Sequence, residues 1–93
     1  MEKELYLLVW VDNNAHLNCY HSDKKFYWFF CCYGSLCPKY YKSLTIAKKT
    51  ARKYNNVVVV KARQYNEIAD ATRFMKSQSE VVETIKRMSN LYD

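Results

Sequence analysis

The most hydrophobic stretch of the chain comprises eight consecutive apolar or aromatic residues, from Phe26 to Tyr33, and is followed by Gly34. In an extended conformation, one face would carry Phe26, Trp28, Phe30 and Cys32, and the other Tyr27, Phe29, Cys31 and Tyr33. Aromatic side chains suit a pleated, buried surface. The stretch therefore predicts a β-strand that is covered on both faces.

Three other segments have the pattern of β-strands. Residues 4–12 alternate between two apolar faces, and residues 16–22 follow after an Asp-Asn-Asn turn. A second polar turn leads into the aromatic strand 26–33, so the first three strands are predicted to form an antiparallel meander. The four consecutive valines within 57–63 indicate a fourth, buried strand.

Two segments have the spacing of amphipathic helices. Residues 43–54 begin with Ser43, a favourable N-cap, and carry apolar residues along one stripe: Leu44, Ala47, Ala51 and Tyr54. Residues 66–90 are also helical in pattern, but Ser77 and Glu80 match a capping box, so this segment forms either one helix or two. The order β-β-β-α-β-α predicts an α+β fold. In it, two or three helices pack mostly on one face of a small, mainly antiparallel four-stranded sheet.

Length and composition predict a single domain over residues 1–93, because 93 residues suffice for one modest core. The chain has only one Gly and one Pro, which argues against linkers. No apolar run approaches the roughly 20 residues that a membrane-spanning helix needs. The first residues also lack the features of a signal peptide. We therefore expect a cytoplasmic protein without a membrane partner, whose thiols are reduced.

Charge is distributed unevenly along the chain, which has a formal net charge of +6. No acidic residue occurs between Asp23 and Glu67. Clustered cations attract polyanions and tyrosines stack on bases, so this interval predicts a binding surface for an anionic protein or a nucleic acid. The candidate residues are Lys39, Tyr40, Tyr41, Lys42, Lys48, Lys49, Arg52 and Lys53. The alternative is an ordinary solvated helix face, with the two tyrosines packed at its start.

Cysteine and histidine residues give a second candidate site. Cys19 and His21 are two residues apart on a predicted strand and therefore point the same way. Together with Cys32 and Cys37, which flank the loop at Gly34, they would form a Cys₃His zinc site. The spacing contains no C-x₂-C pair, so the alternative is that the cysteines are small buried hydrophobic residues. The sequence indicates no other cofactor.

Known catalytic motifs are absent from the sequence. The chain has no Gly-rich phosphate loop, no HExxH helix and no obvious pair of carboxylates. A Cys–His nucleophile pair is conceivable, but no third residue is placed to orient it. We therefore expect a protein that is not an enzyme.

A two-layer domain leaves one face of its sheet open, and here that face would carry several large aromatic side chains. Such a surface favours a protein partner or a homodimer. The composition, rich in Lys, Asn and Tyr, is typical of small proteins of phages and other mobile elements. The leading hypothesis is therefore a stoichiometric inhibitor or modulator of a host macromolecule, such as a nucleic-acid-handling complex, in the host cytoplasm. The alternatives are an RNA-binding or DNA-binding domain that uses the basic helix and, third, a structural zinc module.

Overall fold

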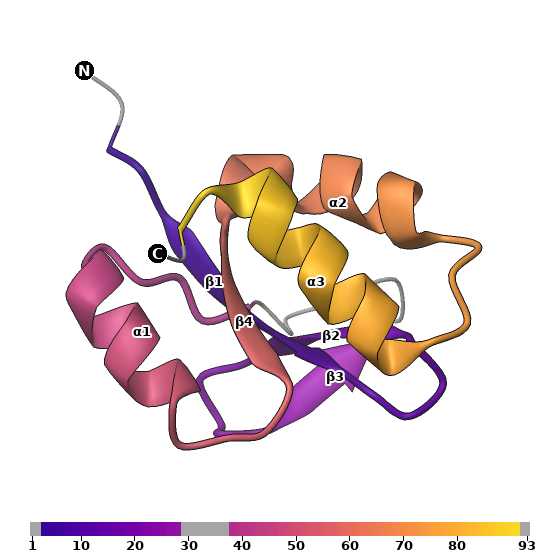
Figure 1. Cartoon of the computed structure of the whole chain (residues 1–93). Helices are drawn as coiled ribbons and strands as arrows, with labels where there is room; N and C mark the ends of the chain where they lie inside the picture. The colour runs from indigo at the N-terminus through magenta and orange to yellow at the C-terminus, as the bar shows by residue number, and fades with distance from the viewer. Residues whose placement is uncertain (1–2, 29–37, 92–93) are drawn as a thin grey trace.

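The fold was obtained as a computed structural model, which describes residues 3–28 and 38–91. Within these residues, the chain order of the elements is β-β-β-α-β-α-α, and a short 3₁₀ helix, η2, follows the last strand (Figure 1). The elements are β1 (Tyr6–Val11), β2 (Leu17–Tyr20), β3 (Phe26–Trp28), α1 (Leu44–Ala51), β4 (Val57–Lys61), η2 (Ala62–Gln64), α2 (Tyr65–Thr72) and α3 (Gln78–Ser89).

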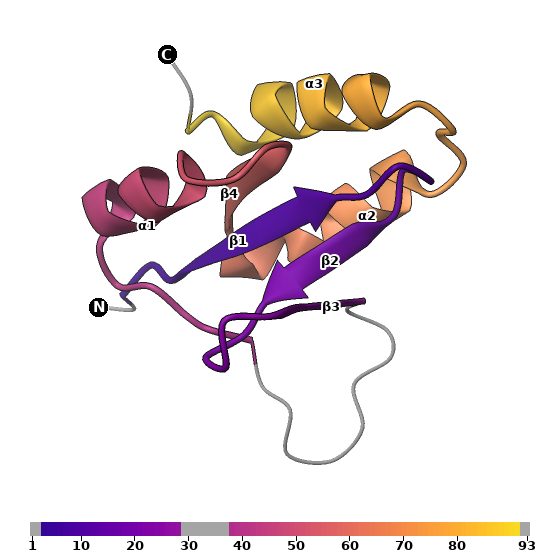
Figure 2. The ribbon, with the colours of Figure 1, turned by 90° about the horizontal axis from the view of Figure 1, so that it is seen from below.

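The four strands form one antiparallel sheet in the order β3-β2-β1-β4. The first three strands form the predicted meander and lie side by side in Figure 2. The valine strand β4 pairs with β1, with Leu8 opposite Val59. The predicted α+β fold with a four-stranded antiparallel sheet is therefore confirmed.

One face of the sheet is covered by α2 and α3. Successive residues of a strand point to opposite faces, so Leu7, Val9 and Val11 of β1 share this face. They are buried with Val60 of β4 and with Ile85 of α3. This cluster forms the larger part of the core among the described residues.

The opposite face is covered by α1 where it crosses β1 and β4 (Figure 1). Leu8 of β1 and Val59 of β4 pack there against Ala47 and Ala51 of α1. Two helices thus share one face, as predicted, whereas α1 lies on the other. The physical reason is that β1 and β4 are apolar on both faces, so each face requires a cover. Trp28, at the end of β3, is 46% exposed.

The observed boundaries refine the predicted ones. Strand β4 ends at Lys61 and η2 follows, and α1 ends at Ala51. The 66–90 segment forms two helices, and the hydroxyl of Ser77 accepts a hydrogen bond from the Glu80 N–H at the start of α3. The remainder of the predicted strand 26–33 falls at 29–33, outside the described residues. Among the described helices, none combines the length and apolar character needed to cross a membrane.

Candidate functional site

Helix α1 presents its basic side chains away from the sheet. Ser43 caps it, because its hydroxyl accepts a hydrogen bond from the Ile46 N–H at 3.3 Å. Ala47 and Ala51, four residues apart, are buried against the sheet. This burial fixes the rotation of the helix, so the cations of its second half lie on the sides and the outer face.

We define the α1 surface as Lys48, Lys49, Arg52 and Lys53. Lys48 and Arg52 are four residues apart, as are Lys49 and Lys53, so the helix and the turn after it form two rows of cations. Lys49, Arg52 and Lys53 are exposed and Lys48 is half-buried. None of the ion pairs found within residues 3–28 and 38–91 includes a member of this set. The structure thus brings four of the eight predicted binding residues together as unneutralised charge.

The other four predicted residues lie on the segment that leads into α1. Its main chain is fixed to the sheet, because Tyr41 and Tyr6 exchange two N–H···O bonds of 2.9 Å. Tyr41 is half-buried and its ring lies 5.7 Å from the Lys39 ammonium. Tyr40 is 47% exposed and Lys42 is exposed. Tyr41 therefore has a packing role, whereas Lys39, Tyr40 and Lys42 remain accessible.

Sequence reasoning missed Tyr54 as a member of this surface. Its position on the apolar stripe of the helix suggested a core residue, but it is 39% exposed and directly follows Lys53. Its ring centroid lies 5.4 Å from that of Phe26 and 6.0 Å from that of Tyr20. The hydrogen bond between the two tyrosines, together with burial, raises the pKa of Tyr20 to about 12. An aromatic ring is thus held in place beside the cations of the α1 surface.

The structure places only half of the predicted zinc site. Cys19 and His21 are both buried, at 0% and 2% exposure, and the His21 ring packs against Tyr27 at 4.6 Å. Among the described residues, neither ring nitrogen of His21 has a hydrogen-bond partner. Cys32 and Cys37 lie outside the described residues. Within the described part of the chain, no group of three or more potential metal ligands occurs.

A cleft that the sequence did not indicate lies between the β1–β2 turn, the end of β3 and α2. Its volume is about 470 Å³. Four buried residues contribute to its lining: Ala15, Leu17, Ala69 and Thr72. Four exposed residues also line it and form its rim: His16, Trp28, Asp70 and Arg73. Residues that are more than 40 positions apart in the sequence line this cleft together, so no local sequence pattern predicts it.

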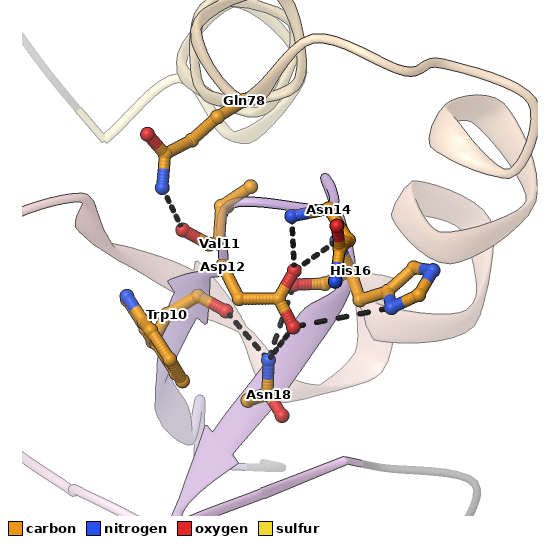
Figure 3. A network of polar contacts seen from close by, with 7 residues as sticks. All are labelled: Trp10, Val11, Asp12, Asn14, His16, Asn18 and Gln78. Atoms are coloured by element: carbon orange, nitrogen blue, oxygen red, sulfur yellow. Dashed lines mark hydrogen bonds and ion pairs between the residues drawn. The ribbon is translucent and has the colours of Figure 1, made fainter.

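One wall of the cleft is fixed by Asp12 (Figure 3). Its carboxylate accepts hydrogen bonds from the N–H groups of Asn14 and His16, both at 2.9 Å, and from the Asn18 amide at 3.2 Å. Partial burial acts to raise the pKa of Asp12, but these hydrogen bonds outweigh it and hold the pKa below its usual value. The Gln78 amide donates to the Val11 carbonyl at 2.6 Å and ties α3 to the same turn.

Comparisons with models of known protein families, with curated proteins and with solved structures gave no match. The chemistry of the described residues is therefore the basis for inferring function. It offers an unpaired cationic surface with an adjacent aromatic ring on one side of the sheet. On the other side it offers an apolar cleft with a charged rim.

Proposed function

We propose that this chain is a small, non-enzymatic binding protein that acts stoichiometrically on an anionic macromolecule through the α1 surface. The observation that carries the proposal is the set of four cations on and just after one helix, none of them in an ion pair with a described residue. Charges of one sign that are not neutralised locally create a field that attracts and steers anionic partners.

The location of the acidic residues supports the same proposal. Glu4 pairs with Lys61 and Arg63, at 3.7 and 3.1 Å, and so neutralises cations at the start of β1 and the end of β4. The remaining acidic residues lie before Lys24 or after Asn66. The positive charge of the α1 surface is therefore available to a partner. The composition of the whole chain, rich in Lys, Asn and Tyr, fits the leading hypothesis of a phage-encoded or mobile-element-encoded modulator of a host macromolecule.

Direct binding of RNA or DNA is the second candidate function, and Tyr54 is the observation that favours it. A nucleic acid offers both phosphates for cations and flat bases for an aromatic ring. Tyr54 is exposed, held by its contacts with Phe26 and Tyr20, and adjacent to Lys53. An acidic protein surface would use the cations and make no such stacking contact.

The test compares two variants of equal net charge on immobilised heparin. The first changes the α1 surface: Lys48→Gln, Lys49→Gln, Arg52→Gln and Lys53→Gln. The matched control changes four exposed cations elsewhere: Lys3→Gln, Lys76→Gln, Lys86→Gln and Arg87→Gln. We expect the α1 variant to elute at clearly lower salt than the control, whereas elution of both at the same salt would contradict the proposal.

Fluorescence anisotropy with labelled single-stranded DNA and RNA then separates the two candidates. Direct nucleic-acid binding requires saturable binding that weakens in Tyr54→Ala and in the α1 variant. Retention on heparin without any binding to either oligonucleotide would favour an anionic protein as the partner. Circular dichroism of each variant checks that the fold is unchanged.

A further inference from the structure

Phe74 is the most exposed large hydrophobic residue of the described chain. It lies in the turn between α2 and α3 and is 85% exposed, compared with 56% for Ile46 and 47% for Tyr40. Burying such a side chain removes apolar surface from water and is therefore favourable. Its only described ring contact is with the guanidinium of Arg73, 5.6 Å from the ring centroid. Phe74 therefore offers an apolar side chain that the described residues leave uncovered.

Arg73 connects Phe74 to the cleft, because Arg73 lines the cleft and its guanidinium lies against the Phe74 ring. The buried lining residues of the cleft include Ala15, Leu17 and Ala69, and its volume of about 470 Å³ lies within the range of ligand-binding pockets. An aromatic side chain suits an apolar floor of this size. Phe74 of the same chain does not fill the cleft, since the ring is almost fully exposed.

Because the exposed Phe74 ring and the cleft lie on the same surface, two copies of that surface are complementary to each other. A two-fold rotation about an axis beside Arg73 would bring each Phe74 opposite the other copy's cleft. Such isologous contacts, in which residue i meets j and j meets i, are the commonest form of protein oligomer. Trp28 and Arg73, which are of residue types that dominate binding hot spots, are among the exposed residues of this surface.

The rim of the cleft carries one charge of each sign, so the rims of two copies can also pair with each other. Asp70 lies in the last turn of α2 and Arg73 is the C-cap of that helix, three residues later, so the two residues lie on the same side. They form no ion pair with each other, and both are exposed. Two α2 helices packed antiparallel about the axis would place Asp70 of each copy opposite Arg73 of the other. The arrangement forms two equivalent ion pairs.

We propose that two copies of this chain associate through this surface, with Phe74 of each copy inserted into the cleft of the other. The partner copy thus completes the site, because it supplies the side chain that occupies the cleft. The interface lies on the α2 side of the sheet and leaves α1, on the opposite face, accessible (Figure 1). The proposal stands independently of the ligand of the α1 surface.

Sedimentation equilibrium over a concentration series tests the proposal. The unmodified chain is expected to be a dimer, and Phe74→Ser to be a monomer with unchanged circular dichroism, since Phe74 contributes little to the monomer's core. The thermal midpoint of the variant should no longer depend on protein concentration, because dimerisation no longer stabilises the folded state. The matched control is Ile46→Ser, which removes a 56% exposed apolar residue from α1 and is expected to stay dimeric. A chain that is monomeric at its highest soluble concentration, or a Phe74→Ser dimer of unchanged affinity, overturns the proposal.

A charge exchange tests the reciprocal pairing within the dimer. Asp70→Arg and Arg73→Asp alone place like charges opposite each other, so each is expected to weaken dimerisation at least tenfold. The double variant Asp70→Arg/Arg73→Asp restores opposite charges and is expected to regain most of the lost affinity. A double variant that is as weak as the single ones overturns the proposed orientation of the two α2 helices.

Discussion

At the scale of single residues, His21 is the most unusual side chain of the core. It is 2% exposed, and both ring nitrogens lack a hydrogen-bond partner within residues 3–28 and 38–91. A buried polar group without a partner costs about 1–3 kcal/mol of stability. His21→Phe removes these polar atoms and keeps a ring beside Tyr27, so it is expected to raise the free energy of unfolding by about 1 kcal/mol. Urea denaturation followed by circular dichroism measures this change, and His21→Leu serves as a second, smaller substitution.

The same substitution, His21→Phe, also tests the zinc hypothesis, which predicts that the free energy of unfolding falls instead of rising. If His21 and Cys19 are ligands, the purified chain contains equimolar zinc, and chelation lowers its stability because metal binding is coupled to folding. Native mass spectrometry before and after treatment with EDTA measures the metal. Stabilisation by His21→Phe in a metal-free protein would remove zinc from consideration. Loss of both zinc and stability would establish His21 as a ligand.

Tyr20 predicts a loss of stability at alkaline pH. Its hydrogen bond with Tyr54 and its burial raise its pKa to about 12, above the value of 10.0 expected without them. The folded state therefore retains the phenolic proton when the unfolded state loses it, and the stabilisation is complete below about pH 10. It should be lost progressively as the pH rises from about 10 to 12. Urea denaturation across this range measures the effect, and Tyr54→Phe is expected to flatten it.

Single residues also show where sequence reasoning stops. Alternation of apolar residues was sufficient to predict β1, because Leu7 and Leu8 must each be covered on their own face. The same reasoning assigned Tyr54 to the core, since helical spacing gives the direction of a side chain but not the distance to its neighbours. No sequence pattern predicted the exposure of the Phe74 side chain either, because that exposure depends on how the other elements pack.

At the scale of elements, α3 begins at a side-chain cap, Ser77. The Ser77 hydroxyl accepts a hydrogen bond from the Glu80 N–H at 3.4 Å, and Ser77 is itself exposed. Ser77→Ala leaves this N–H without its partner and is expected to lower the free energy of unfolding by about 1 kcal/mol. Ser77→Asp is the matched control, because aspartate also caps helices, and should be nearly neutral. Equal destabilisation by both variants would show that the cap is not the cause.

The α1 surface makes a quantitative prediction for the case in which the ligand is nucleic acid. Each phosphate neutralised by a cation on a single strand contributes about −0.7 to the slope of log affinity against log salt. Four contacts therefore predict a slope of about −2.8, and Lys49→Gln alone should reduce its magnitude by about 0.7. Anisotropy titrations at several salt concentrations measure the slope. Binding that does not change with salt would exclude the phosphate-contact mechanism.

The order and type of the elements were predictable because each satisfies a local rule. Ser43 and Ser77 begin helices that follow their apolar periodicity, and the four valines from Val57 form a strand in any context that buries them. The side of the sheet on which α1 packs was not predictable from a local rule. It follows from the pairing of β4 with β1, which creates a two-sided apolar surface only once the strands are assembled.

At the scale of the whole molecule, the sheet separates two surfaces of different chemistry. Helix α1 lies on one side, and α2 and α3 lie on the other (Figures 1 and 2). The α1 surface belongs to the first side, and the second side carries Phe74, in the turn between α2 and α3, and the cleft. Because the two surfaces lie on different sides, one surface can be occupied without blocking the other. A dimer formed through Phe74 would therefore present two α1 surfaces at once.

Two α1 surfaces in one dimer predict avidity for long polyanions. Once the first surface is bound, the second binds at a high effective concentration, which can strengthen binding by about 10²–10⁴-fold when the ligand spans both sites. Phe74→Ser is therefore expected to weaken binding to long heparin or a long single strand at protein concentrations where the unmodified chain is dimeric. It should not change binding to a short oligonucleotide that covers one surface. Surface plasmon resonance with short and long ligands measures the difference. An equal loss for both lengths would mean that Phe74 itself contacts the ligand, and no loss for either would mean that the two α1 surfaces are not engaged together.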